Sequence, residues 1–296
     1  MTLVKKYKRT MSVYEQKLML TNWAQKKQKE LISMDSYLKD YYPGNMADVH
    51  FARYFFACTS TLTYKTPATT EKYFKQAGFI DHNLVSVDGA QCYVLVSPKM
   101  IVVSFRGTEP KEFSDIKADL KSWKTDSETD GHVHAGFKHE LDKIWAPILT
   151  YIQINKDKSL YITGHSLGAA MATLAASRVQ KYSNFRSLYT YGSPRVGNKR
   201  FLLGCTFSHV RVQNNNDLVC QTPPMLLGYR HHVPSTYINF YGNIRKLTKW
   251  QKIKDMFRGR WRALQKFQFF DGIMDHSMAK YSKNLHQQWK NNASNS

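Results

Sequence analysis

The sequence predicts an α/β fold in which a mostly parallel sheet is covered by helices on both faces. Short apolar runs alternate with longer segments of helical period along most of the chain, and this alternation is typical of βαβ units. Residues 101–105, IVVSF, form a nearly continuous apolar run, as expected for a strand buried on both faces.

Three helices and six strands are expected in the α/β part of the chain, and helices alternate with strands along it. The expected helices are residues 47–62, 135–153 and 166–181, and the expected strands are residues 91–96, 101–105, 160–163, 188–191, 208–212 and 237–241. The turn-like run Tyr42, Pro43, Gly44, Asn45 ends a predicted helical N-terminal extension, residues 1–45. One domain is then expected over residues 46–285, followed by a flexible polar tail, residues 286–296.

The charge of the chain indicates a polyanionic partner. Of its 296 residues, 43 are Lys or Arg and 22 are Asp or Glu, which gives a net charge of +21 and favours nucleic acid or anionic lipid. No recognised nucleic-acid-binding motif accompanies the charge, so nucleic acid is the weaker expectation. The basic N-terminus lacks the apolar core of a Sec signal peptide. A cytoplasmic or peripheral membrane location is therefore expected, with signal-independent export left open.

The first chemical signal is a GxSxG motif, Gly164 to Gly168, between a predicted strand and a predicted helix. This context is that of a nucleophile elbow, where glycines permit a tight turn and the serine hydroxyl projects from the sheet. Ser166 is thus the candidate nucleophile. The alternative is an ordinary serine at a helix N-cap.

A serine nucleophile needs a histidine base and an acid that orients it, in the chain order Ser, Asp, His. Asp217 follows a predicted strand, at the sheet edge where the elbow lies, and His276 follows the last predicted strand. The alternatives are an Asx turn at Asp217 and a histidine at a helix start. Asp275 adjoins His276 and is poorly placed to hold its ring. The remaining histidines of this region are expected to be structural: His209, His231 and His232.

An oxyanion hole requires two donors, normally the amide after the nucleophile and one from an earlier loop. Leu167 supplies the first amide. Gly107 closes the strand IVVSF and permits a turn that directs Thr108 to the same point. The alternative is a simple strand-ending turn. The four cysteines show no CxxC spacing, which argues against a zinc site.

Seven motifs together resemble the fungal-type class 3 lipases in order and spacing, over roughly residues 47–285. They are FRGT, VHAGF, TGHSLGAA, YGSPRVGN, NNNDLV, GYRHHV and DHSMAKY. The resemblance implies an α/β-hydrolase fold and a serine carboxylic-ester hydrolase acting on lipids, an acylglycerol lipase, with no cofactor or metal. It further implies that Ser166, Asp217 and His276 form the triad and that Thr108 and Leu167 form the oxyanion hole.

The chain departs from the family pattern in two places. Where the family commonly has Asp-Trp after FRGT, this chain has Asp115 followed by Ile116, and Ala169 replaces a second glycine after the elbow. If a lid exists, residues 109–124 are the candidate, because they mix large apolar side chains with charges.

Residues 244–266 predict a basic amphipathic helix, with nine basic residues, one acid, and apolar residues at steps of three or four. Such helices lie on anionic membranes. The alternative is a helix that packs its apolar side on the domain. The charge also leaves two other functions open: a phospholipase A1 on anionic membranes, and a non-catalytic lipase-like lipid-binding protein.

Overall fold

The computed structural model describes residues 34, 36–107, 123–244, 248, 250–251, 254 and 275–294. The chain divides into two compact units, Met1–Asp40 and Tyr41–Ser296. In the first unit, residues 34 and 36–38 are helical, and the rest of the predicted helical extension lies outside the described residues. This division lies after Asp40, whereas the extension was predicted to end at residue 45. Tyr41 belongs to the second unit because its hydroxyl hydrogen-bonds Thr59 Oγ1 at 2.8 Å and its ring packs on Phe55.

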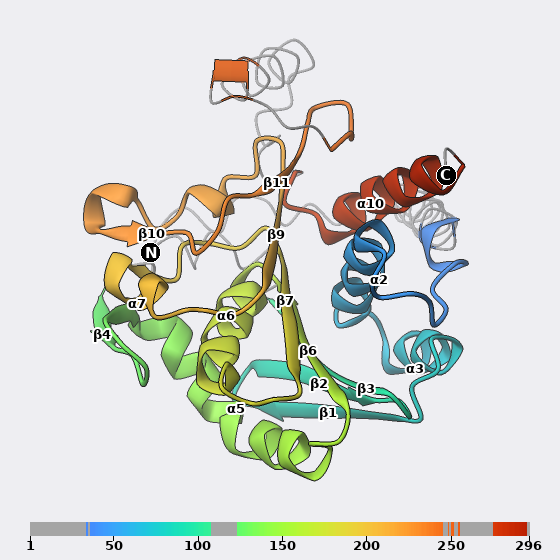
Figure 1. The fold of residues 1–296 in the computed structure, drawn as a ribbon, viewed down its shortest axis with the longest axis horizontal. Coiled ribbons are helices and arrows are strands. Elements are labelled where there is room, and N and C mark those ends of the chain that lie inside the picture. Colours follow the sequence, from blue (N-terminus) through green and yellow to red (C-terminus); the bar gives the residue numbers. More distant parts are fainter. Residues whose placement is uncertain are drawn as a thin grey trace, which may run out of the picture. The chain divides into compact units, whose positions relative to one another are not determined.

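A seven-stranded sheet forms the centre of the second unit (Figure 1), in the order β1-β2-β3-β6-β7-β9-β11. The first three strands pair antiparallel, and each later neighbour pairs parallel. The predicted mostly parallel sheet is therefore confirmed. Its strands are β1 (Asp81–Val87), β2 (Ala90–Val96), β3 (Met100–Phe105), β6 (Ser159–His165), β7 (Phe185–Tyr191), β9 (His209–Asn214) and β11 (Thr236–Ile238).

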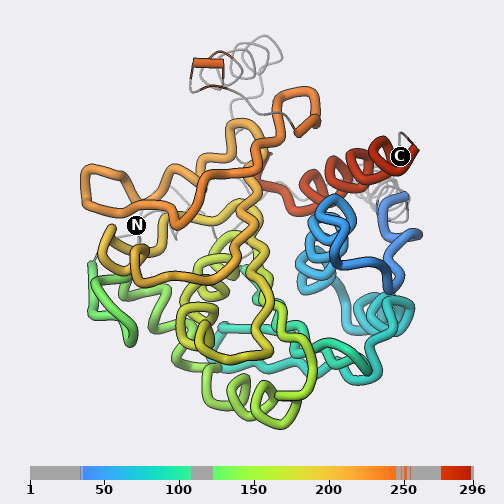
Figure 2. The backbone as a smooth tube through the Cα atoms, viewed as in Figure 1, coloured from blue at the N-terminus to red at the C-terminus, as the bar shows by residue number. Residues whose placement is uncertain are grey.

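Helices cover both faces of this sheet, as Figures 1 and 2 show. One face packs on α5 (Ala135–Ile154) and α6 (Leu167–Val179), and the other on α2 (Val49–Leu62). Next to α2 lie α3 (Pro67–Gln76) and α10 (Met278–Ala293). The sheet is thus the middle of three layers.

Strand alternation divides the core between the two faces. On the α5 and α6 side, Ile162 and Leu188 belong to the main apolar cluster. On the α2 side, the Phe56 ring packs on Tyr161 at 5.1 Å and stacks on Tyr189 at 4.4 Å between centroids. Neighbouring residues of β6 and β7 therefore face opposite layers, which explains the apolar runs in the sequence.

Two expectations about the chain's end are wrong. The predicted strand 237–241 ends at Ile238, because Asn239 Oδ1 accepts hydrogen bonds from the amides of Tyr241 and Asn243 and turns the chain. The polar tail is helical through Ala293, since Trp289 of α10 stacks on Tyr54 of α2 at 5.1 Å. Aromatic contacts with α2 thus accompany helical structure in a segment whose composition predicts fraying.

Several short elements lack a signal in the sequence. A four-stranded antiparallel sheet, in the order β10-β8-β5-β4, has strands of two or three residues, too short to show a period. These elements are β4 (Lys124–Asp126), β5 (His132–His134), β8 (Gly197–Asn198), β10 (Tyr229–Arg230), α7 (Lys199–Leu203), η1 (Val219–Gln221) and η2 (Met225–Leu227). In the part of the chain that is described, the helices are too short or too polar to span a bilayer.

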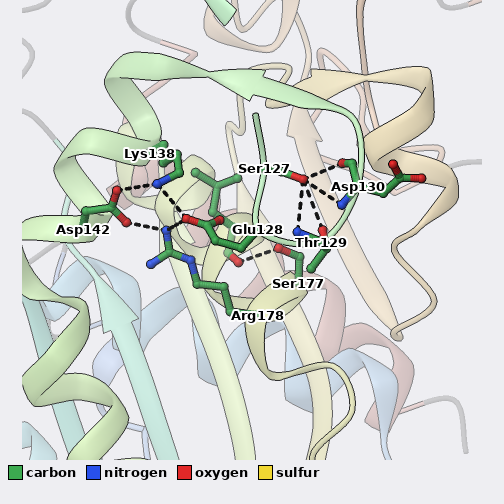
Figure 3. Close-up of polar contacts among 9 residues, drawn as sticks. Ser127, Glu128, Thr129, Asp130, Lys138, Asp142, Ser177 and Arg178 are labelled. Carbon is green, nitrogen blue, oxygen red and sulfur yellow. Dashed lines mark hydrogen bonds and ion pairs between the residues drawn. The ribbon is translucent and has the colours of Figure 1, made fainter. Parts of the chain in front are cut away.

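A cluster of ion pairs attaches the loop after β4 to α5 and α6 (Figure 3). Glu128 lies between Lys138 and Arg178, with 2.7 Å from its Oε1 to each cation, and Asp142 contacts the same two cations. Both carboxylates are partly exposed, 41 % for Glu128 and 42 % for Asp142. This group of four side chains, called the surface cluster below, holds the loop after β4 against α5 and α6.

Candidate active site

The turn between β6 and α6 has the backbone of a nucleophile elbow. Ser166 has φ 59° and ψ −128°, a strained conformation for a residue other than glycine. A Cβ at Gly164 would overlap the Gly168 carbonyl, and a Cβ at Gly168 would overlap that of Phe105. Both glycines of the motif are therefore required by the close approach of β3, β6 and α6.

The Ser166 side chain does not cap α6, so the alternative of an ordinary N-cap serine is excluded. Its Oγ is buried and has no hydrogen-bond partner within the described ranges. The serine amide donates to Tyr191 O at 3.1 Å, which fixes the elbow against the end of β7. The hydroxyl is thus held in place by the backbone alone.

Asp217 and His276, 59 residues apart in the chain, meet directly. His276 Nδ1 lies 2.9 Å from Asp217 Oδ2 and 3.0 Å from Oδ1, and both side chains are buried. Since the carboxylate only accepts, Nδ1 donates, and the neutral ring keeps Nε2 as its proton acceptor. The structure therefore brings together the acid and the base expected from the sequence.

The acid is held ionised by its neighbours. Burial alone would raise the pKa of Asp217, but the adjacent His276 and the hydrogen bonds from His276 and Tyr281 lower it below the ordinary value. Tyr281 Oη donates to Asp217 Oδ2 at 2.6 Å and accepts from the Asn214 amide at 2.9 Å. Burial raises the pKa of Tyr281 well above its usual value, so the phenol remains a donor. The Val219 amide also donates to Asp217 Oδ1, so the Asx turn considered as the alternative is present beside the contact with His276.

Sequence reasoning missed Tyr281. It lies five residues after His276 on α10, inside the motif DHSMAKY, which was the available signal. As predicted, Asp275 does not hold the imidazole. Its Oδ2 instead accepts from Asn215 Nδ2 and from the Asn216 amide, and its Oδ1 pairs with Lys280. Asp275 thus fastens the loop that presents Asp217.

Gly192 is a second residue that sequence reasoning missed. It follows β7 with φ +58°, and an added Cβ would lie 2.8 Å from Asp217 Oδ2 and from His276 Nδ1. No side chain fits there while the acid and the base remain in contact. The motif YGSPRVGN contains this glycine, but only the tertiary structure shows what it faces.

His165, the residue before the nucleophile, joins the oxyanion turn to the catalytic histidine loop. Its Nε2 donates to His276 O at 2.8 Å, and its Nδ1 accepts from Tyr64 Oη at 2.9 Å. The same phenol accepts from the Gly107 amide at 2.9 Å. Burial, together with the nearby His276, lowers the pKa of His165 to about 3, so the ring is neutral.

The two expected oxyanion residues are described unequally. Leu167 is the first residue of α6, directly after Ser166. Thr108 and almost all of the lid candidate, residues 109–122, lie outside the described residues. Gly107 is described, and a Cβ there would lie 3.0 Å from Ser166 Cβ. The turn that leads to Thr108 is therefore packed against the nucleophile.

The other histidines are held away from the triad, as expected. His209 contacts Thr190 Oγ1 and His232 Nδ1, and His232 Nε2 donates to Cys205 O. His231 Nε2 donates to Cys220 O. Each of these rings has its own hydrogen-bond partner apart from Ser166.

Comparison with known proteins identifies the same region. Residues 102–227 match the family model of the class 3 lipases. A secreted mono- and diacylglycerol lipase of Fusarium solani is 34 % identical over 157 residues, which are 48 % of this chain and 44 % of the relative. One from Penicillium cyclopium is 36 % identical over 156 residues, or 51 % of this chain and 47 % of the relative. The matches thus span less than half the length of these curated relatives.

Solved structures extend the likeness to the fold. The lipase of Rhizopus microsporus var. chinensis has 25 % identity and a TM-score of 0.53, covering 67 % of this chain and 76 % of that chain. The triacylglyceride lipase of Rhizomucor miehei has 19 % identity and a TM-score of 0.58, covering 79 % and 94 %. The region that matches the class 3 lipase family, residues 102–227, includes Ser166 and Asp217, and the chain has the α/β-hydrolase fold of these lipases.

Proposed function

We propose that this protein is an acylglycerol lipase that hydrolyses carboxylic esters of lipids through an acyl-enzyme. The main support is the hydrogen bond of 2.9 Å between His276 Nδ1 and Asp217 Oδ2 beside the strained elbow at Ser166. The named activity of the relatives, mono- and diacylglycerol lipases, supports an ester of glycerol as the substrate.

In the first half-reaction, Ser166 Oγ attacks the ester carbonyl and His276 Nε2 takes the hydroxyl proton. Asp217 keeps the ring in the required tautomer and stabilises the imidazolium that forms. The amides of Leu167 and Thr108 are proposed to hold the oxyanion. His276 then gives the proton to the departing alcohol, which leaves the acyl group on Ser166.

In the second half-reaction, water takes the place of the alcohol. His276 removes a proton from this water, the resulting oxygen attacks the acyl carbonyl, and the fatty acid leaves as Ser166 regains its proton. The fixed position of His276, whose own carbonyl accepts from His165 Nε2, allows one ring to act in both steps.

The net charge of +21 supports a membrane as the place of action and a phospholipid as the second candidate substrate. Residues 244–266 are proposed to contact anionic membranes, and most of them lie outside the described residues. Within them, Trp250 is described and its side chain is exposed, with Lys254 Nζ 5.6 Å from the ring centroid. An exposed Trp beside a cation suits the boundary between lipid and water.

Hydrolysis of three substrates tests the proposal: a soluble short-chain ester, an acylglycerol emulsion and anionic phospholipid vesicles. Ser166→Ala should lower kcat by about a million-fold. Ser183→Ala, at an exposed serine, serves as the matched control and should retain full activity.

The pattern across substrates separates the candidates. Faster hydrolysis of acylglycerols supports the lipase, and faster hydrolysis of vesicles supports the phospholipase A1. Equal, background rates for the wild type and Ser166→Ala on all three substrates would contradict both, and vesicle binding without turnover would then indicate the lipid-binding protein.

A further inference from the structure

A small recess between α6, β9 and the segment after β10 is lined by arginine and histidine side chains. Arg211 of β9, Arg230 of β10 and three histidines face it: His209, His231 and His232. Among the described residues, no carboxylate lines this recess. The triad lies elsewhere, although β9 leads from Arg211 to Asp217.

Arg211 is a buried cation that forms no ion pair with a carboxylate among the described residues. Its side chain belongs to a residue only 6 % exposed, its Nε donates to Val233 O at 3.0 Å, and its buried Nη1 has no hydrogen-bond partner in the described ranges. A guanidinium remains charged in proteins. Burying such a charge without an anion costs several kilocalories per mole, so buried arginines normally pair with an acid.

The groups nearest to Arg211 do not supply a negative charge. Cys220 and Tyr281 interact with it, but burial raises the pKa of both well above their usual values, so both are neutral. The third group, Arg195, is itself positively charged. Burial and the Arg211 charge together lower the pKa of His231 to about 3, which keeps that ring neutral.

The histidines of the recess have fixed tautomers that suit this neutral state. His232 Nε2 donates to Cys205 O, so its Nδ1 accepts from His209 Nδ1 at 3.1 Å. His209 Nε2 in turn accepts from Thr190 Oγ1 at 2.8 Å. The histidine rings are thus held in place by hydrogen bonds, and Arg211 brings to the recess a buried Nη1 that has no hydrogen-bond partner in the described ranges.

We propose that this recess is a binding site for one small monovalent anion of halide size, normally chloride, held by the guanidinium of Arg211. The space is about 10 Å³, close to the least volume that holds one water-sized particle, so a small ion suits the recess better than a phosphate or a lipid headgroup. A water molecule would satisfy Nη1 but leave the charge uncompensated. A halide does both.

The site would connect elements that support the triad. Besides Arg211, its lining includes Ser193, the residue after Gly192, and Thr173 of α6, the helix that begins at the elbow. Anion binding is therefore expected to stabilise the folded second unit. This effect does not depend on whether the protein hydrolyses lipids.

Thermal unfolding of the full chain in sodium chloride and in sodium gluconate at equal ionic strength tests the site. Chloride should raise the wild-type Tm by about 2 to 4 °C in a saturable way. Arg211→Gln should lose this chloride-specific rise. Arg186→Gln, which removes one exposed positive charge, should keep it and so controls for net charge. Equal Tm of the wild type in both salts, or an unchanged rise in Arg211→Gln, would overturn the proposal.

Bromide provides a test that needs no variant, should Arg211→Gln not fold. Crystals of the wild-type protein in sodium bromide should show an anomalous peak within hydrogen-bond distance of Arg211 Nη1. No peak there would overturn the proposal. A peak at high bromide without the saturable rise in Tm would also overturn it, because the site would then hold an adventitious ion only.

Discussion

Two clusters of polar side chains in this protein hold carboxylates in opposite ways. Asp217 is fully buried and receives hydrogen bonds from His276, Tyr281 and the Val219 amide. Glu128, in the surface cluster, is 41 % exposed and lies between two cations. Water therefore screens the charge of Glu128 but not the charge of Asp217.

The difference between the two clusters shows where the exact position of a charged group controls activity. In the buried cluster, each donor fixes one oxygen of Asp217 and so fixes the ring of His276. In the surface cluster, two cations are shared between two partly exposed carboxylates, and each carboxylate can also be solvated by water. We therefore expect the buried cluster to control activity steeply and the surface cluster to contribute little to activity or stability.

The contrast is tested most strongly by Asp217→Asn. An amide is nearly the same shape as the carboxylate, but it removes the charge and no longer selects the tautomer with a proton on Nδ1. We expect kcat on a soluble ester to fall about ten-thousand-fold. Asp157→Asn, at an exposed aspartate, is the control. A loss of less than tenfold would mean that His276 does not depend on this carboxylate.

Gly192→Ala tests whether space around the buried pair is as important as its charge. The new methyl group would lie 2.8 Å from Asp217 Oδ2 and His276 Nδ1, and the residue would keep a positive φ. We expect kcat to fall about a hundred-fold, because a small displacement of a catalytic group has this effect.

The matched control for this change is Gly89→Ala. Gly89 also has a positive φ, +85°, but a Cβ there meets no atom within 4 Å. The two variants share the backbone strain and differ only in the contact with the triad. Equal kinetics of the two would show that the contact is unimportant.

Tyr281→Phe removes one donor from the buried carboxylate. Because the folded pKa of Asp217 is depressed, its stabilising effect is fully present above the ordinary carboxyl pKa of about 4 and is lost as the pH falls through the lower folded value. The variant should lose about 1.5 to 3 kcal/mol of unfolding free energy at pH 7.

This loss should shrink as the pH falls below about 4 and through the lower folded pKa of Asp217, where the carboxyl group of the folded wild type becomes protonated. Urea unfolding measured across this pH range checks the trend. Tyr182→Phe, at a partly exposed tyrosine, should match the wild type throughout. A loss in Tyr281→Phe that does not vary with pH would place the effect in packing rather than in the hydrogen bond to Asp217.

Glu128→Gln should have the smallest effect. It weakens the ion pairs with Lys138 and Arg178, but Asp142 still contacts both cations. We expect kcat to stay within about twofold and Tm to change by about 2 °C or less. A large loss of activity would show that the loop after β4 is coupled to the site.

Much of the fold could be predicted because its central strands and flanking helices are long enough to show a period. The strand before Ser166 and the helix after it were expected within a few residues of their observed bounds. Short strands such as β8, with two residues, form only because a neighbouring strand is present to pair with them. The helical structure of α10 up to Ala293 likewise depends on the contact of Trp289 with α2.

The candidate site likewise has residues that the sequence predicts and residues that only the structure reveals. The residue types and order of Ser166, Asp217 and His276 are a property of the chain itself, because a tight turn and a strand end require local sequence. The roles of Tyr281, Gly192 and Tyr64 depend on partners far away in the chain, so hydrophobic period and spacing do not show them, although motifs contain Tyr281 and Gly192.

By itself, therefore, the sequence determined most of the central sheet, the elbow and the order of the three triad residues, because hydrophobic period and glycine placement act over a few residues. Tertiary structure alone decided that Asp217 is buried and ionised, that Gly192 faces the acid and the base, and that Arg211 is buried without an acid among the described residues. Burial and hydrogen bonding depend on atoms that the fold brings together, and these determine the charge and reactivity of each group.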